Sequence, residues 1–281
     1  MNTFNCIRSL MLMSALAVIS SCNSTSNDDA SHADSTSTAA TTPQAGVSLA
    51  DFSSSPDFPD ARLSLGDVKA AAAGDSVKLS FNFNVSGYEL KHQTDDAAGK
   101  QCNNSDKGQH IHFILDNRPY VALYEPKHEV TVAKNTEHYL LCFLSRSYHE
   151  SLKGKGASML YHFKVDEAGK LVKMDDPQTP MVFYSRPKGD YLGKDTKNVL
   201  FDFYVWNGTL GNNLKVKADV SAGGHDTSML ISEWKPYVLN NLPMGKNSIK
   251  LTLVDSAGNK VNGPETEVTR EFTLAADEPM K

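Results

Sequence analysis

Apolar and polar residues alternate along this chain from Val47 onward, and this alternation limits the fold more than any other feature. Side chains of a strand point alternately to the two faces of a sheet, so a period of two indicates strands rather than helices. The clearest run is Val77–Val85, VKLSFNFNV, and no window has the apolar spacing of an amphipathic helix. The other predicted strands are His110–Asp116, Tyr139–Leu144, Met159–Val165, Val199–Val205, Met229–Ile231, Ile249–Val254 and Val268–Leu274. Turn-forming residues separate them, which predicts an all-β fold of immunoglobulin-like β-sandwiches.

The predicted strands recur in a second copy, and the offset between the copies falls from 120 to 109 residues. The alignment pairs 79–85 with 199–205, 118–121 with 235–238, Leu140–Leu144 with Ile249–Leu253, and Phe163 with Phe272. Agreement at successive strands indicates a duplicated unit with trimmed loops. We therefore predict two tandem sandwiches, at 47–181 and 199–276, joined by a short ordered linker at 182–198.

The first residues read as a targeting segment rather than as part of the fold. Arg8 precedes an apolar run, Leu10–Ile19, that is too short to cross a bilayer, so 1–21 are predicted to be a signal peptide. Ile19-Ser-Ser-Cys22 resembles the lipobox of bacterial lipoproteins. That resemblance implies acyl chains on Cys22 and, with Asn23 next to it, an outer-membrane location. An ordinary signal peptide cut nearby is the alternative.

Residues 22–46 are predicted to form a disordered tether. From 23 to 46 the chain has no aromatic or large aliphatic side chain, so it cannot bury enough apolar surface to offset its ordering entropy. The formal net charge of the whole chain is −5, with 28 Lys and Arg against 33 Asp and Glu and no basic block. This balance argues against a nucleic-acid partner.

The cysteines leave two structures open. Cys142 aligns with Leu251 within an aliphatic run of the second copy, so it should point into the core of the first sandwich. There it is either a buried thiol or half of a disulfide. Cys102 is its only partner in the mature chain besides Cys22, and pairs of thiols outside the cytoplasm tend to oxidise. We therefore expect a Cys102–Cys142 bridge.

Histidine is concentrated in the first sandwich and marks a candidate metal site. His110 and His112 are two residues apart on a predicted strand, so both imidazoles leave the same face about 7 Å apart at Cα. Further candidate ligands are His128, His138 and His149. Neutral imidazoles from neighbouring strands suit copper or zinc. The alternative is that these histidines are only hydrogen-bonded to the backbone. The repeat alignment pairs His110 and His112 with Thr227 and Met229, so the fold itself does not require histidine there.

Two resemblances extend this interpretation. The stretches Gly108–Asp116, Lys127-His128, Glu137-His138 and Tyr148-His149 resemble a His-rich periplasmic domain family of unknown function, of which this chain keeps one or two histidines in each cluster. Residues 56–275 resemble Gram-negative lipoproteins usually labelled phosphopeptide-binding. The shared stretches are 55–63, 93–102, 143–151 and 183–189. The second resemblance implies a peptide ligand in the cell envelope, phosphopeptides included.

Arginines near serine and tyrosine form a second candidate site. Arg146 beside Tyr148, and Arg186 beside Lys188, would bind an anion if they converged, whereas solvated loops or salt bridges are the alternative. No nucleophile elbow, HExxH, Walker or dinucleotide motif is present, so an enzyme is not expected. The sequence thus predicts a lipid-anchored envelope protein that binds copper or zinc through the first sandwich. The alternative is a metal-free adaptor that binds a peptide, protein or glycan through sandwich loops.

Overall fold

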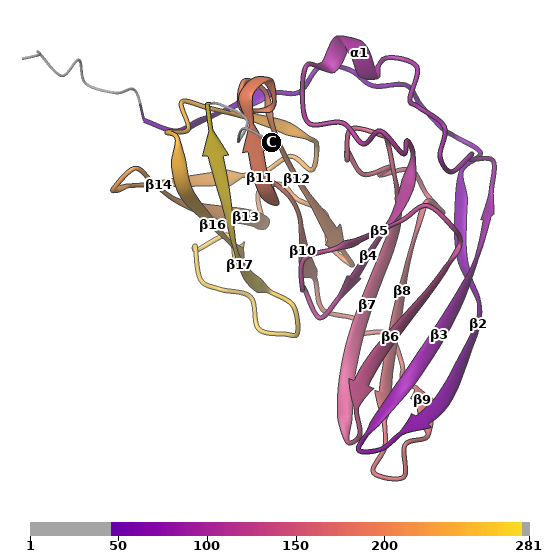
Figure 1. Ribbon diagram of the computed structural model, residues 1–281. Coiled ribbons are helices and arrows are strands. Elements are labelled where there is room, and N and C mark those ends of the chain that lie inside the picture. The colour runs from indigo at the N-terminus through magenta and orange to yellow at the C-terminus, as the bar shows by residue number, and fades with distance from the viewer. Residues whose placement is uncertain (1–45, 277–281) are drawn as a thin grey trace, which may run out of the picture. The chain divides into compact units, whose positions relative to one another are not determined.

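The computed structural model describes residues 46–276, which are built almost entirely of strands (Figure 1). Strands β1–β17 form four sheets, and the helical elements of the described residues are α1, Ala97–Lys100, and the 3-10 turn η1, Gly193–Thr196. The prediction of an all-β fold with tandem immunoglobulin-like sandwiches is confirmed. The predicted signal peptide, Cys22 and all of the tether except Gly46 lie outside the described residues. Among residues 46–276, no helix has the length and apolarity needed to cross a membrane.

The first sandwich pairs a three-stranded sheet with a five-stranded sheet. The smaller sheet has the order β2-β3-β6, at Arg62–Ala73, Ser76–Ser86 and Lys127–Ala133. The larger has the order β5-β4-β7-β8-β9, at Val121–Leu123, His110–Leu115, Thr136–Ser145, Ser158–Val165 and Leu171–Lys173. All pairings within both sheets are antiparallel.

The core of the first sandwich lies between these sheets. Leu140, Cys142 and Leu144 of β7 are fully buried there, which confirms the predicted inward face. They pack with Phe81 of β3 and Phe113 of β4, whose rings meet edge to face at 5.5 Å. Burial of each such side chain contributes about 1.5–3 kcal/mol to folding.

The second sandwich has a four-stranded and a five-stranded sheet. The first has the order β1-β15-β12-β10, at Ser48–Asp51, Tyr237–Asn240, Val199–Trp206 and Met181–Arg186. The second has the order β11-β17-β16-β13-β14, at Gly189–Leu192, Glu267–Ala275, Gly245–Asp255, Leu214–Ala222 and His225–Ile231. Its core includes Phe201, Phe203, Leu251 and Phe272.

The segment expected as a linker, 182–198, is instead part of the second sandwich. β10 pairs with β12, and β11 runs parallel to β17 at the edge of the other sheet. Val182 and Tyr184 of β10 lie in the core of this sandwich, so their apolar side chains need it for burial. β1 also pairs with β15, which moves residues 48–51 from the first sandwich to the second.

The predicted repeat alignment is correct for three pairs of strands and wrong for the segments that lie between them in the sequence. β3 matches β12, β7 matches β16, and β8 matches β17, as aligned. Val121, however, lies on β5 beside β4, whereas its supposed match Val238 lies on β15 beside β12. The true counterpart of β4 is β13, because Ile111 pairs with Leu144 as Val216 pairs with Leu253.

This corrected alignment changes the counterparts of the histidines. His110 and His112 correspond to Lys215 and Lys217 of β13, not to Thr227 and Met229. Both lysines are partly exposed, whereas both histidines are fully buried. The outer face of β4 is therefore buried in the first sandwich, whereas the outer face of its counterpart β13 is partly exposed in the second.

The difference arises because the two sandwiches pack against each other. An apolar cluster joins Ile114, Leu141 and Phe143 of the first sandwich to Met181, Phe183 and Tyr204 of the second. The rings of Phe143 and Tyr204 stack with centroids 5.0 Å apart. As a result, all six residues of β4 are buried, although only alternate ones face the sandwich core. His110 and His112 lie on the other face, toward the second sandwich.

Candidate metal centre

His110 is held in a defined orientation by the turn that precedes β4. Gly108 has a positive φ of 81°, and a Cβ there would lie 2.5 Å from two backbone oxygens, so only glycine fits. The carbonyl oxygen of Gly108 is 2.8 Å from Nδ1 of His110. A carbonyl only accepts hydrogen bonds, so Nδ1 of the ring carries the proton and donates it. Nε2 of His110 is therefore left with a free lone pair.

Three imidazole nitrogens converge at this lone pair. Nε2 of His112 lies 3.0 Å from Nε2 of His110, and Nδ1 of His149 lies 3.1 Å from the same atom. One nitrogen from each ring lies within 4.8 Å of the other two, and this is the group of potential metal ligands found among residues 46–276. The side chains of His110 and His112 are fully buried, and His149 is 7% exposed.

His149 reaches the cluster from the loop after β7 rather than from a strand. Its backbone N–H donates to the carbonyl of Arg146, which closes a tight turn, and its φ is 70°. A positive φ is uncommon for a residue other than glycine and places the imidazole where an extended backbone would not. The turn therefore brings His149 next to His110, although the two residues are 39 positions apart in the sequence.

The spacing of the nitrogens matches a metal coordination shell. Imidazole nitrogens about 2.0 Å from a tetrahedral metal ion are about 3.3 Å from one another. The two short distances in the cluster, 3.0 and 3.1 Å, are close to that value. Nε2 of His110 has one lone pair but two nitrogen neighbours, so hydrogen bonding alone satisfies this group poorly. A cation at the common centre would accept a lone pair from all three rings.

Electrostatics keep the imidazoles in the form that binds metals. Burial, helped by the charges of Arg186 and Lys188 and opposed by the Gly108 hydrogen bond, lowers the pKa of His110 to about 4. Burial also holds the pKa values of His112 and His149 well below their ordinary value, with like charges contributing. All three rings are therefore neutral at pH 7, which is the state that metal coordination requires.

Two residues that the sequence analysis did not single out complete the site. The ring of Tyr120 stacks on that of His112 with centroids 3.6 Å apart, and its hydroxyl lies 3.2 Å from Nδ1 of His149. Ser185, on β10 of the second sandwich, places its hydroxyl 3.2 Å from Nδ1 of His112. Ser185 orients the ring of His112 through the nitrogen that lies outside the cluster, as outer-shell partners of metal sites do. Tyr120 orients the same ring by stacking, and its hydroxyl lies beside the nitrogen of His149 that would bind the metal. Tyr120 was within the misaligned repeat segment, which hid its role.

Two of the expected ligands do not join the cluster. His138 shares the inward face of β7 with Leu140, and its Nδ1 lies 2.7 Å from the carboxylate of Asp116. His128 is on β6, in the opposite sheet, where its ring contacts that of Phe113. The prediction that either residue binds the same metal is wrong, because residues on the core side and on the other sheet cannot reach the outer face of β4.

The arginines expected to converge on an anion have other partners. Arg146 is ion-paired with Glu150 at 3.1 Å, so the salt-bridge alternative holds for this residue. Tyr148 packs against Phe52 in a small apolar cluster. Arg186 is buried, with its guanidinium 5.4 Å from the ring of Tyr120 and in hydrogen-bond contact with the hydroxyl of Tyr191. It therefore belongs to the surroundings of the histidines rather than to an anion site with Arg146.

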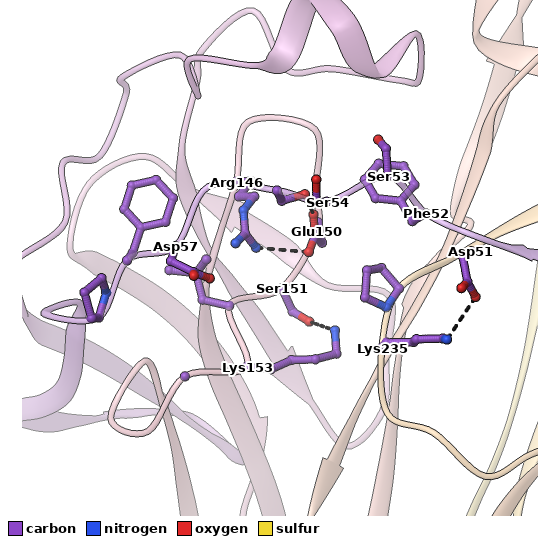
Figure 2. A pocket seen from close by; sticks show the side chains of 16 residues that line it. Asp51, Phe52, Ser53, Ser54, Asp57, Arg146, Glu150, Ser151, Lys153 and Lys235 are labelled. Atoms are coloured by element: carbon purple, nitrogen blue, oxygen red, sulfur yellow. Dashed lines mark hydrogen bonds and ion pairs between the residues drawn. The ribbon is translucent and has the colours of Figure 1, made fainter.

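A separate pocket of about 550 Å³ lies next to Arg146 (Figure 2). Its walls come from the loops around residues 51–59 and 150–154 and from 235–236. Its lining includes three acidic and three basic side chains, and Figure 2 shows that Arg146 pairs with Glu150 and Asp51 with Lys235. The pocket therefore has a mixed lining without a concentration of one charge.

The predicted disulfide is absent from the described residues, where Cys102 and Cys142 are both free and buried. Cys142 lies in the core of the first sandwich, whereas Cys102 lies in the cluster that includes Phe52 and Tyr148. The two thiols are separated because Cys142 points between the sheets of the sandwich, and the loop of Cys102 packs outside them. Burial raises the pKa of Cys102 to about 12, so its thiol is not reactive.

Comparisons with protein-family models and with curated proteins find no match. Among solved structures, the fibronectin type III-like modules of Clostridium thermocellum CbhA match 75% of this chain and 93% of theirs, at 11% identity and a TM-score of 0.25. The FN1–FN3 domains of chicken CNTN1 match 79% of this chain and 68% of theirs, at 11% identity and a TM-score of 0.25. The extracellular domain of the putative hybrid two-component system BT3049 from B. thetaiotaomicron matches 80% of this chain and 39% of its own, at 12% identity and a TM-score of 0.27. Similarity at this level does not bear on function.

Proposed function

We propose that this chain is a cell-envelope protein that binds one copper or zinc ion through His110, His112 and His149. The observation that carries the proposal is the convergence of three neutral imidazole nitrogens on one buried point, with spacings of 3.0 and 3.1 Å. Imidazole is a preferred ligand of both metals. Gly108 and Ser185 contact the ring nitrogens of His110 and His112 that lie outside the cluster, and such partners commonly accompany metal ligands.

The proposal includes a lipid anchor at Cys22 and an outer-membrane location. Both rest on the lipobox-like sequence Ile19–Cys22 and on the tether-like composition that follows it. We also propose a binding role rather than catalysis, because the sequence has no recognisable nucleophile or metalloprotease motif. Mass spectrometry of the protein released from its native membrane tests the anchor, since a chain that begins before Cys22 or lacks acyl groups contradicts it.

Elemental analysis tests the metal site directly. The full chain is purified in detergent without chelators, incubated with Cu or Zn, freed of excess metal and analysed. We expect one bound ion per chain that is lost in His149→Asn and retained in His138→Gln. His138 is the matched control because it is a buried histidine outside the cluster. A ratio that stays near zero, or one that is equal in both variants, contradicts the proposal.

The pocket of Figure 2 favours a second candidate, an adaptor that binds a peptide or glycan through sandwich loops. Phe52 and Phe58 supply apolar surface to its lining, and Arg146 and Lys153 supply hydrogen-bond donors. Crosslinking in intact envelopes tests this candidate. A partner that is recovered with the native chain and lost with Phe58→Ala supports the adaptor, and equal recovery with both contradicts it.

A further inference from the structure

Two basic side chains lie beside the histidine cluster, separated from it by one aromatic ring. Lys188 donates a hydrogen bond from Nζ to the carbonyl oxygen of Tyr120 at 2.9 Å, and Nζ lies 4.2 Å from the centre of that ring. The guanidinium of Arg186 lies 5.4 Å from the same ring. The ring of Tyr120 in turn stacks on His112 at 3.6 Å. An ion bound by the histidines would therefore be close to two positive charges.

Nothing among the described residues offsets these charges at the cluster. The group of potential ligands holds three histidines and no carboxylate or thiol. The nearby acids have other partners: Glu150 pairs with Arg146, and Asp202 pairs with Lys153. Consistent with this, Arg186 and Lys188 both lower the pKa values of all three imidazoles.

The charge of the bound ion then decides how strongly it is repelled. Coulomb energy is proportional to the product of the charges, so a divalent ion is repelled twice as strongly as a univalent ion at the same point. A buried site screens this repulsion little. Zinc in addition prefers four ligands, commonly with an anionic ligand or a water among them. Three neutral nitrogens beside two cations are therefore a poorer match for a divalent ion than for univalent copper.

We propose that the His110, His112 and His149 site is selective for Cu(I) over divalent ions, with Arg186 and Lys188 as the residues that determine this selectivity. The proposal rests on the proposed metal-binding function and deepens it by naming the oxidation state. It requires no redox step, because copper enters and leaves the site as the univalent ion.

The test measures how the affinities for two metals respond to the removal of one charge. Dissociation constants of the full chain are determined for Cu(I), supplied as its bicinchoninate complex under anaerobic ascorbate, and for Zn(II), against a chromophoric chelator. Only the binding that His149→Asn abolishes is assigned to the site. We expect Cu(I) to bind more tightly than Zn(II) in the native chain.

Lys188→Met keeps the length of the side chain and removes its charge. We expect it to lower both dissociation constants, and to lower that for Zn(II) by about the square of the factor by which it lowers that for Cu(I), because the repulsion scales with ion charge. A change of about threefold for Cu(I), for example, would correspond to a change of about tenfold for Zn(II). Lys188→Arg retains the charge and should leave both constants unchanged. Lys215→Met, on β13 at the position equivalent to His110, is the control for a lysine outside the site and should have no effect.

The outcomes separate this inference from the function on which it rests. If neither metal shows binding that depends on His149, the metal-binding function fails and this inference fails with it. If both metals bind but Zn(II) binds at least as tightly, only the selectivity fails. Equal factors for the two metals in Lys188→Met also overturn the selectivity, because a change in packing rather than in charge would then explain the effect.

Discussion

Nε2 of His110 and Nε2 of His112 lie 3.0 Å apart, although the two residues are separated by one position on strand β4. Side chains at i and i+2 of a strand start about 7 Å apart at Cα, so the two rings must lean toward each other. The Gly108 carbonyl holds one ring and the stacked Tyr120 ring holds the other. The ligand nitrogens are therefore brought together before any ion is bound, which lowers the cost of binding one.

Metal binding should stabilise the native chain and not the His149→Asn variant. Asn tolerates the left-handed backbone of position 149, φ 70°, so this substitution removes the ring without straining the turn. An ion at 100 times its dissociation constant should raise the free energy of unfolding of the native chain by about 2.7 kcal/mol. Thermal unfolding with and without Cu(I) measures this. A similar rise of the transition temperature in the variant contradicts the assignment of His149 as a ligand.

Tyr120→Phe should strengthen metal binding while it preserves the fold, because the hydroxyl competes with the ion for the lone pair on Nδ1 of His149. The variant keeps the ring that stacks on His112 and removes the hydroxyl that lies 3.2 Å from Nδ1 of His149. Loss of one hydrogen bond costs the metal-free chain about 1 kcal/mol of stability, and removal of the same competing bond should raise metal affinity by up to about fivefold. Metal competition and urea denaturation measure the two effects. Tyr139→Phe, whose hydroxyl bonds Glu137 outside the site, is the control and should bind metal normally.

The metal-free chain should lose stability as the pH falls from about 6.5 to about 4. The pKa of His110 is about 4 in the folded chain and 6.5 in its ordinary state, so the unfolded chain binds more protons in this window. The free energy of unfolding is therefore fully retained above pH 6.5 and falls on acidification, by about 3 kcal/mol for His110 alone. His112 and His149 shift in the same direction and add to the loss.

Urea denaturation of the metal-free chain at pH 7 and pH 4.5 measures this dependence. The His149→Asn variant should lose less stability between the two pH values than the native chain, because one buried imidazole no longer has to remain neutral. Contributions from carboxylates are common to both chains and cancel in the comparison. An equal loss in the two chains shows that His149 does not titrate as its burial requires.

Tyr184→Ala should destabilise the second sandwich strongly, although this residue lies in the segment expected as a linker. Its side chain is almost fully buried in the core of that sandwich, and removing a large aromatic core side chain costs about 3–5 kcal/mol. Leu230→Ala is the control, because Leu230 is 61% exposed and surface changes stay within about 0.5 kcal/mol. Denaturant midpoints of both variants measure the difference. A loss in Tyr184→Ala as small as in the control would restore the linker interpretation.

The sequence was sufficient to predict the buried face of a strand where that face lies in the core of its own sandwich. The alignment of Leu140, Cys142 and Leu144 with the aliphatic Ile249, Leu251 and Leu253 predicted an inward face correctly, because equivalent strands bury equivalent positions. The period of two along a strand placed His110 and His112 on a common face. The prediction failed for β10, where Met181–Tyr184 is a short unbroken apolar run, and only its pairing with β12 makes it a strand of the second sandwich.

The sequence by itself determined that the chain folds into tandem sandwiches. It also determined that His110 and His112 share one face of one strand, because successive side chains of a strand point to opposite faces of the sheet. Only the tertiary structure decided that this face is buried, that His149 and Tyr120 reach it, and that His128 and His138 do not. These facts depend on how the sandwiches pack and how a loop turns at residue 149. Contacts between residues distant in sequence are set by the packing of whole sheets, which no local pattern encodes.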